Sequence, residues 1–77
     1  MGKPYYPVRS VVVGVITALY VEDGATVQEG DKLVEVEMMK VFHRVEACAD
    51  GTIEWVAALG QTVGQGALLA KLYPLEK

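Results

Sequence analysis

The chain has 77 residues, of which 52% are hydrophobic and 22% are charged, and its formal net charge is −3. This profile excludes a disordered chain and predicts one small domain that is held together by apolar burial. A single cysteine and a single histidine cannot form an internal disulfide or a metal site, and the absence of a basic cluster argues against a nucleic-acid partner. The apolar run 11–21 is too short to cross a bilayer, so we expect a soluble, cytoplasmic protein with no membrane partner.

An internal repeat organises the chain from its first third to its end. The first copy consists of Gly14-Val15-Ile16 and the segment 24–33, and the second consists of Gly51-Thr52-Ile53 and the segment 60–69. The glycines that open the two copies are separated by 37 residues, whereas the two longer segments are separated by 36. One residue has been gained or lost between these blocks, a change that a loop can absorb.

Each copy has the pattern of short strands separated by turns. The Gly-x-Ile element begins a β-branched run, and Gly-x-x-Val-x-x-Gly-x-x-Leu predicts a turn, a short strand and a second turn, in which glycine supplies positive φ. Residues 41–47 alternate with the period of two that is typical of a half-buried strand, and no segment has a capped helical stripe. The chain is therefore predicted to be all-β, a sandwich or flattened barrel with a pseudo-twofold repeat.

The segment Glu37-Met38-Met39-Lys40-Val41 lies between the two copies, where flanking strands predict a hairpin turn. A tight turn selected for stability favours Asn-Gly or Asp-Gly, because its central residues need positive φ. Two methionines and a lysine do not meet that need, which indicates selection for something other than stability. A longer loop would relax this constraint.

These five residues resemble the Glu-Ala-Met-Lys-Met signature of biotin carboxyl carrier domains. The resemblance covers about residues 8–73 and includes both glycine-rich repeats in register around the lysine. It implies two four-stranded antiparallel sheets with the modified lysine at the tip of the central hairpin. The connection 19–23 leaves no room for the protruding segment of the fatty-acid-synthesis branch, so the chain resembles the thumbless type.

The resemblance implies a non-catalytic carrier whose working residue is Lys40, to which a biotin protein ligase attaches biotin through an amide. Met39 matches the methionine before the lysine, and Glu37 matches the acidic residue three positions upstream. Met38 stands where alanine is commonest, a mild change on an exposed hairpin, and Val41 stands where methionine is usual, which weakens the match to the signature that the ligase prefers. The resemblance implies that these four neighbours of Lys40 provide ligase recognition and the hairpin context. The implied partners are this ligase and the biotin carboxylase and carboxyltransferase domains or subunits between which the arm carries a carboxyl group.

Two alternatives remain open. A lipoyl carrier of a 2-oxo acid dehydrogenase-type complex shares the fold and the lysine hairpin, but its usual signature is Asp-Lys-Ala, so Met39 favours biotin over lipoate on Lys40. An unmodified lipoyl-like structural module would lack the Met-Lys signature. We expect residues 1–7 to be an N-terminal extension, 8–73 the domain and 74–77 a tail, with His43 in a structural or surface role, and Cys48 and Trp55 as packing residues.

Overall fold

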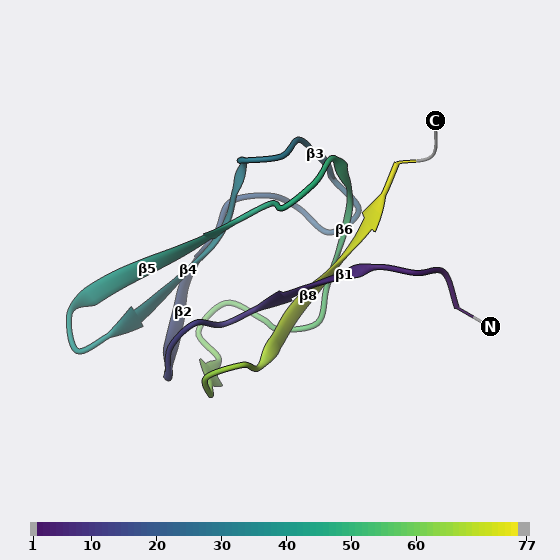
Figure 1. The fold of residues 1–77 in the computed structure, drawn as a ribbon. Coiled ribbons are helices and arrows are strands. Elements are labelled where there is room, and N and C mark those ends of the chain that lie inside the picture. The colour runs from purple at the N-terminus through teal and green to yellow at the C-terminus, as the bar shows by residue number, and fades with distance from the viewer. Residues whose placement is uncertain (1, 76–77) are drawn as a thin grey trace.

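The computed structural model describes residues 2–75, and it confirms an all-β fold of eight strands in two four-stranded antiparallel sheets (Figure 1). One sheet has the strand order β1-β8-β6-β3 and the other has the order β5-β4-β2-β7. No helix in the described part of the chain is long and apolar enough to cross a membrane. The strands are β1 (Tyr6–Arg9), β2 (Gly14–Leu19), β3 (Thr26–Val27), β4 (Lys32–Met38), β5 (Val41–Glu46), β6 (Gly51–Trp55), β7 (Thr62–Val63) and β8 (Leu68–Pro74).

The sequence repeat is a structural repeat. Strands β1 to β4 correspond in order to β5 to β8, and exchanging each strand for its counterpart converts the order of one sheet into that of the other. Strands β4 and β8 each have seven residues and nearly the same pattern of buried and exposed positions. Each sheet therefore contains strands from both copies, so neither copy can form its own sheet, and the predicted pseudo-twofold sandwich is confirmed.

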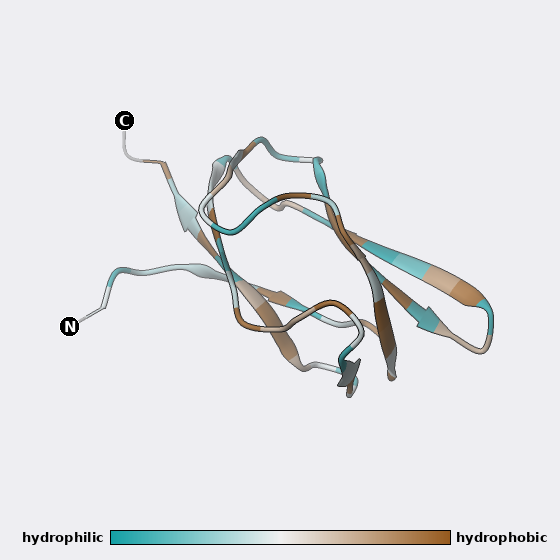
Figure 2. Cartoon of the chain, turned by 180° about the vertical axis from the view of Figure 1, so that it is seen from behind, coloured by the Kyte–Doolittle hydropathy of each residue, from teal (hydrophilic) through white to brown (hydrophobic). Residues whose placement is uncertain are grey.

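The core lies between the two sheets and is built from the inward-facing residues of the longer strands. Hydrophobic and hydrophilic residues alternate along the β4–β5 hairpin, as the bands of Figure 2 show. Burying these aliphatic side chains is the main source of stability in a chain without a disulfide. The largest side chains with less than 2% exposure are Ile16, Leu33, Ile53, Leu69, Leu72, Val27, Val34 and Val36.

The repeat glycines serve two structural purposes. Gly24, Gly30, Gly60 and Gly66 all have positive φ, between 82° and 91°, as the turn pattern predicts. The other two approach backbone so closely that a Cβ would collide with a carbonyl oxygen, that of Glu37 for Gly14 and that of Tyr73 for Gly51. The same contact therefore recurs at the two pseudo-equivalent crossings.

The strands extend slightly past the expected domain bounds, and one residue expected to pack is exposed. Strand β1 begins at Tyr6, within the segment expected to be an extension, and Pro74 of the expected tail closes β8. Met1 and residues 76–77 lie outside the described residues. Cys48 is exposed in the turn after β5, so the expectation that it packs was wrong, whereas Trp55 packs against the core and donates its Nε1–H to the Val21 carbonyl at 3.0 Å.

Candidate functional site

The turn between β4 and β5 consists of Met39 and Lys40 alone. Met38 pairs directly with Val41, and the two central residues have φ values of 50° for Met39 and 66° for Lys40. Positive φ at both positions defines a type I′ turn, the geometry whose twist matches that of the flanking strands. These two are also the only non-glycine residues with positive φ in the described chain, so the turn combines a tight geometry with unsuitable residues.

The turn forms the tip of a hairpin that projects from one end of an elongated molecule of 41 × 25 × 17 Å (Figure 1). Met39 is 90% exposed, Lys40 and Val41 are exposed, and Met38 is 37% exposed. Glu37 is half-buried, and its backbone carbonyl lies against Gly14. The five residues singled out in the sequence thus occupy one tip, with Lys40 and Met39 most accessible.

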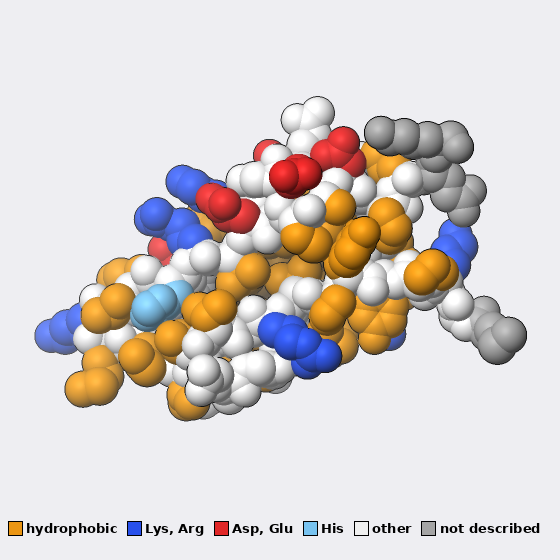
Figure 3. Space-filling view, in the orientation of Figure 1, with side chains coloured by type: hydrophobic (Ala, Val, Ile, Leu, Met, Phe, Trp, Pro, Cys, Tyr) orange, Lys and Arg blue, Asp and Glu red, His pale blue; other side chains and the backbone are white. Residues whose placement is uncertain are grey.

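Strand register assigns the neighbouring side chains to two faces of the hairpin, because directly paired antiparallel residues point to the same side. Val36 pairs with His43, and the Met38–Val41 pair follows on that inner face. Glu37 pairs with both Val15 and Phe42 on the outer face. Val15 and Phe42 are exposed, and Figure 3 shows hydrophobic side chains gathered around the projecting end of the hairpin.

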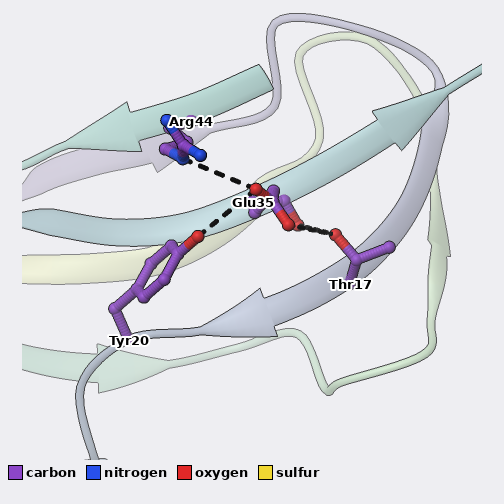
Figure 4. Close-up of polar contacts among 4 residues, drawn as sticks. All are labelled: Thr17, Tyr20, Glu35 and Arg44. Atoms are coloured by element: carbon purple, nitrogen blue, oxygen red, sulfur yellow. Dashed lines mark hydrogen bonds and ion pairs between the residues drawn. The ribbon is translucent and has the colours of Figure 1, made fainter. Parts of the chain in front are cut away.

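A polar network fastens the base of the hairpin on the same outer face (Figure 4). Glu35 of β4 accepts hydrogen bonds from the hydroxyls of Thr17 at 3.0 Å and Tyr20 at 3.3 Å, and it pairs with Arg44 Nε at 3.5 Å. The Tyr20 hydroxyl, followed by the charge of Glu35, raises the pKa of Arg44. One carboxylate therefore links β2, the residue after it and the edge strand β5.

The ammonium group of Lys40 forms no ion pair with the described residues 2–75. The two ion pairs among residues 2–75 join Arg44 to Glu35 and Lys71 to Glu54. His43 is half-buried three residues after Lys40, and its Nε2 atom is buried without a hydrogen-bond partner among the described residues. A structural or surface role stays the prediction for His43, which pairs with Val36 in the β4–β5 ladder.

The geometry at the tip presents Lys40 and Met39 to solvent. An open depression is lined by Lys3, Tyr73 and Leu75. Strand β1 begins and strand β8 ends at the pole opposite the hairpin (Figure 1). No group of three or more His, Cys, Asp or Glu side chains suited to a metal occurs within residues 2–75. A repeated β-unit with an exposed lysine on a two-residue turn is the architecture of a carrier domain.

Comparison with known proteins identifies the family. The biotin/lipoyl profile, described as "Biotin-requiring enzyme", matches residues 7–72, so the chain belongs to this family. It is 38% identical over 65 residues to the mitochondrial propionyl-CoA carboxylase alpha chain of Homo sapiens. That alignment covers 83% of this chain but 9% of the relative, so the chain corresponds to a small part of the larger protein.

Solved structures agree on the fold. A single-chain, multi-domain long-chain acyl-CoA carboxylase superposes with a TM-score of 0.82 at 25% identity, over 95% of this chain and 8% of that one. The Kluyveromyces lactis urea carboxylase superposes with a TM-score of 0.84 at 23% identity, over 94% of this chain and 6% of that one. This likeness supports the fold alone. The lipoyl domain of the 2-oxoglutarate dehydrogenase complex of Azotobacter vinelandii superposes with a TM-score of 0.68 at 36% identity, over 94% of this chain and 91% of that one. The chain is a non-catalytic carrier domain, similar to the biotin carrier domains of carboxylases.

Sequence reasoning missed three residues around the site. Phe42 and Val15 flank Glu37 on the outer face, and Glu35 anchors the hairpin base. The alternation along residues 41–47 predicted that Phe42 and Val41 point to opposite faces of their strand. It did not show which residues of other strands would lie beside Phe42. Only the register of β2 against β4 brings these residues together.

Proposed function

We propose that Lys40 is the residue that carries biotin, attached by a biotin protein ligase. The observation that carries this proposal is the turn itself, in a chain of the biotin-requiring family. An exposed lysine follows an exposed methionine in a type I′ turn for which neither residue is suited. Strain of this kind is retained where surrounding structure enforces it and function requires the side chains.

The residues present fit an amide-linked cofactor. The Lys40 amine is accessible and makes no ion pair with the described residues, so a ligase can remove its proton and allow it to attack an activated acyl group. Met39, 90% exposed beside it, offers a flexible apolar contact to the ligase. When bound, biotin supplies a ring that accepts and releases a carboxyl group.

The proposed partners follow from this role. The arm would serve a biotin carboxylase site and a carboxyltransferase site, and tethering gives an effective concentration of roughly millimolar at each site. The rigid hairpin fixes where the arm begins, because the Glu35 network fastens β5 to β4 and β2. The long lysine side chain then provides reach without any unfolding of the domain.

A second candidate is lipoylation of Lys40. It is favoured by the 36% identity to a lipoyl domain of nearly the same length, although the superposition is poorer than with the long-chain acyl-CoA carboxylase. The lysine, the hairpin and the fold are common to both carriers. Met39 before the lysine supports biotin.

The test is to incubate the purified chain with a biotin protein ligase, biotin and ATP, and in parallel with a lipoate ligase, lipoate and ATP. Intact-mass spectrometry is expected to show one biotinyl adduct on the wild-type chain and none on Lys40→Arg, which retains the charge. A lipoyl adduct without a biotinyl adduct would establish the second candidate. No adduct from either ligase, for a chain shown to be folded, would overturn both.

A further inference from the structure

Strand β5 is a free edge of its sheet, and it is the least protected edge in the described part of the molecule. The four edge strands are β1, β3, β5 and β7. Pro7 removes a backbone donor from β1, and β3 and β7 have two residues each. Strand β5 has six residues, no proline and exposed Val41 and Phe42, so it can pair with a further strand.

The hairpin geometry determines which backbone groups are available on this edge. In a two-residue type I′ hairpin the closing pair, Met38–Val41, is hydrogen-bonded, and hydrogen-bonded pairs alternate with pairs that are not. Val36–His43 is therefore the next bonded pair, and Phe42 and Arg44 direct their N–H and C=O groups away from β4. An added antiparallel strand must bond to Phe42 and Arg44.

The segment from Lys40 to Glu46, Lys-Val-Phe-His-Arg-Val-Glu, is complementary to itself when it is reversed about His43. This register puts Val41 beside Val45, Phe42 beside Arg44, and Lys40 near Glu46. The apolar pair shares one face, and the guanidinium can lie over the phenyl ring on the other. Phe42 and Arg44 form the bonded pair, as their outward backbone groups require.

The two neighbouring registers of the strand pair place cationic side chains opposite each other. Centring the pair on Phe42 would set Lys40 against Arg44, and centring it on Arg44 would set two guanidinium groups side by side. Like charges directly opposite each other destabilise a strand pair. A second copy of this chain, antiparallel and centred on His43, is therefore the occupant that fits the edge.

We propose that the chain forms a reversible homodimer through β5, in which Lys40 lies near Glu46 of the partner subunit. The result is an eight-stranded sheet continuous across two molecules, with the tip lysine of each next to the other's edge strand. Because a single strand pair buries little surface, the dimer is weak and transient. The proposal concerns the unmodified chain and does not depend on which cofactor Lys40 carries.

Charge reversal tests the register with the full-length chain. In Lys40→Glu each copy presents two acidic residues at the paired positions, and in Glu46→Lys each presents two basic ones. The contact occurs twice in the dimer, so each variant alone is expected to associate roughly tenfold more weakly than wild type. An equimolar mixture restores association, because both contacts are then between opposite charges.

Sedimentation velocity at chain concentrations from about 10 μM to 1 mM, in about 0.15 M salt, where the Debye length is about 8 Å, measures the association. Glu54→Lys, on β6 and away from the edge, makes the same change in charge and is expected to leave association unchanged. Circular dichroism checks that Glu46→Lys is folded, since Glu46 also pairs with Lys32 within the chain. A wild-type chain that stays monomeric at 1 mM, or a mixture no tighter than the single variants, overturns the proposal.

A backbone change gives a second test that leaves every side chain in place. Chemical synthesis of the full 77-residue chain with an N-methyl group on the Phe42 amide removes one outward donor without touching the β4–β5 ladder. Association is expected to fall below detection. Retained dimerisation in a folded N-methylated chain would show that β5 is not the interface.

Discussion

Gly14 of β2 packs directly against the backbone carbonyl of Glu37 in β4, three residues before Lys40, and leaves no room for a Cβ. The contact brings the first repeat against the base of the hairpin that carries the lysine. Its counterpart, Gly51 against Tyr73, occurs at the pseudo-equivalent crossing of β6 and β8. Close approach of two backbones, rather than a special dihedral angle, therefore accounts for both glycines.

The first prediction concerns this contact. Gly14→Ala is expected to lower the free energy of unfolding by about 1–3 kcal/mol, because backbone must shift to accept the methyl group. Urea denaturation followed by Trp55 fluorescence measures the change. Gly64→Ala is the matched control, since a Cβ added at Gly64 would meet no atom within 4 Å and the residue has no positive φ, so this variant should not lose stability. Equal losses in the two variants would refute the packing explanation.

The second prediction concerns the strained turn. Met39→Gly is expected to raise the free energy of unfolding by about 1 kcal/mol, because glycine adopts positive φ without steric cost. Loading by the biotin ligase should slow by roughly 5- to 30-fold, the loss of a contact worth about 1–2 kcal/mol. Met39→Leu keeps an apolar side chain and should leave both quantities nearly unchanged. A Met39→Gly chain that is more stable and is biotinylated at the wild-type rate would show that the ligase does not recognise the methionine.

The third prediction separates the position of the lysine from its presence. Exchanging the two central residues, as Met39→Lys with Lys40→Met, preserves composition and the exposed turn but moves the amine by one residue. Loading is expected to fall on the order of 100-fold, because a misplaced nucleophile loses its alignment in the ligase site. Time-resolved intact mass measures this. Loading that proceeds at an unchanged rate at residue 39 would mean that any exposed lysine at the tip suffices.

The fourth prediction concerns the network at the hairpin base. Glu35→Ala removes the acceptor for Thr17 and Tyr20 and the partner of Arg44, and it is expected to lower the free energy of unfolding by about 1–2 kcal/mol. Amide exchange in β5 should rise more than exchange in β6. Glu54→Ala breaks an exposed ion pair of 3.9 Å with Lys71 and is expected to cost less than about 0.5 kcal/mol. Similar exchange in both strands would argue against a local role for Glu35.

The sequence predicted the fold because its repeat is a chemical pattern. Gly24 and Gly60 occupy equivalent turns with positive φ, and Val27 and Val63 are the buried residues of equivalent short strands. The place of Lys40 between the copies, and the unsuitable chemistry of its turn, were also visible in the order of residues alone.

Contacts between distant residues could not be predicted in the same way. Thr17 and Glu35 are 18 positions apart, and they meet only because β2 pairs with β4 in one register with a local irregularity between Ile16 and Ala18. Composition favoured a packed Cys48, yet the turn after β5 leaves it exposed. Register and loop course depend on the summed packing of the whole domain, which no short motif encodes.

The pseudo-twofold arrangement has a geometric consequence for attachment. The position equivalent to the β4–β5 turn lies between β8 and β1, which pair with each other but are not joined by a turn. Figure 1 shows that β1 begins and β8 ends at the pole opposite the hairpin. A linker fused to either end, or to both, therefore meets the domain far from Lys40 along its 41 Å axis. Rotation of the whole domain about such a linker would displace Lys40 over a much longer distance than rotation of its side chain alone.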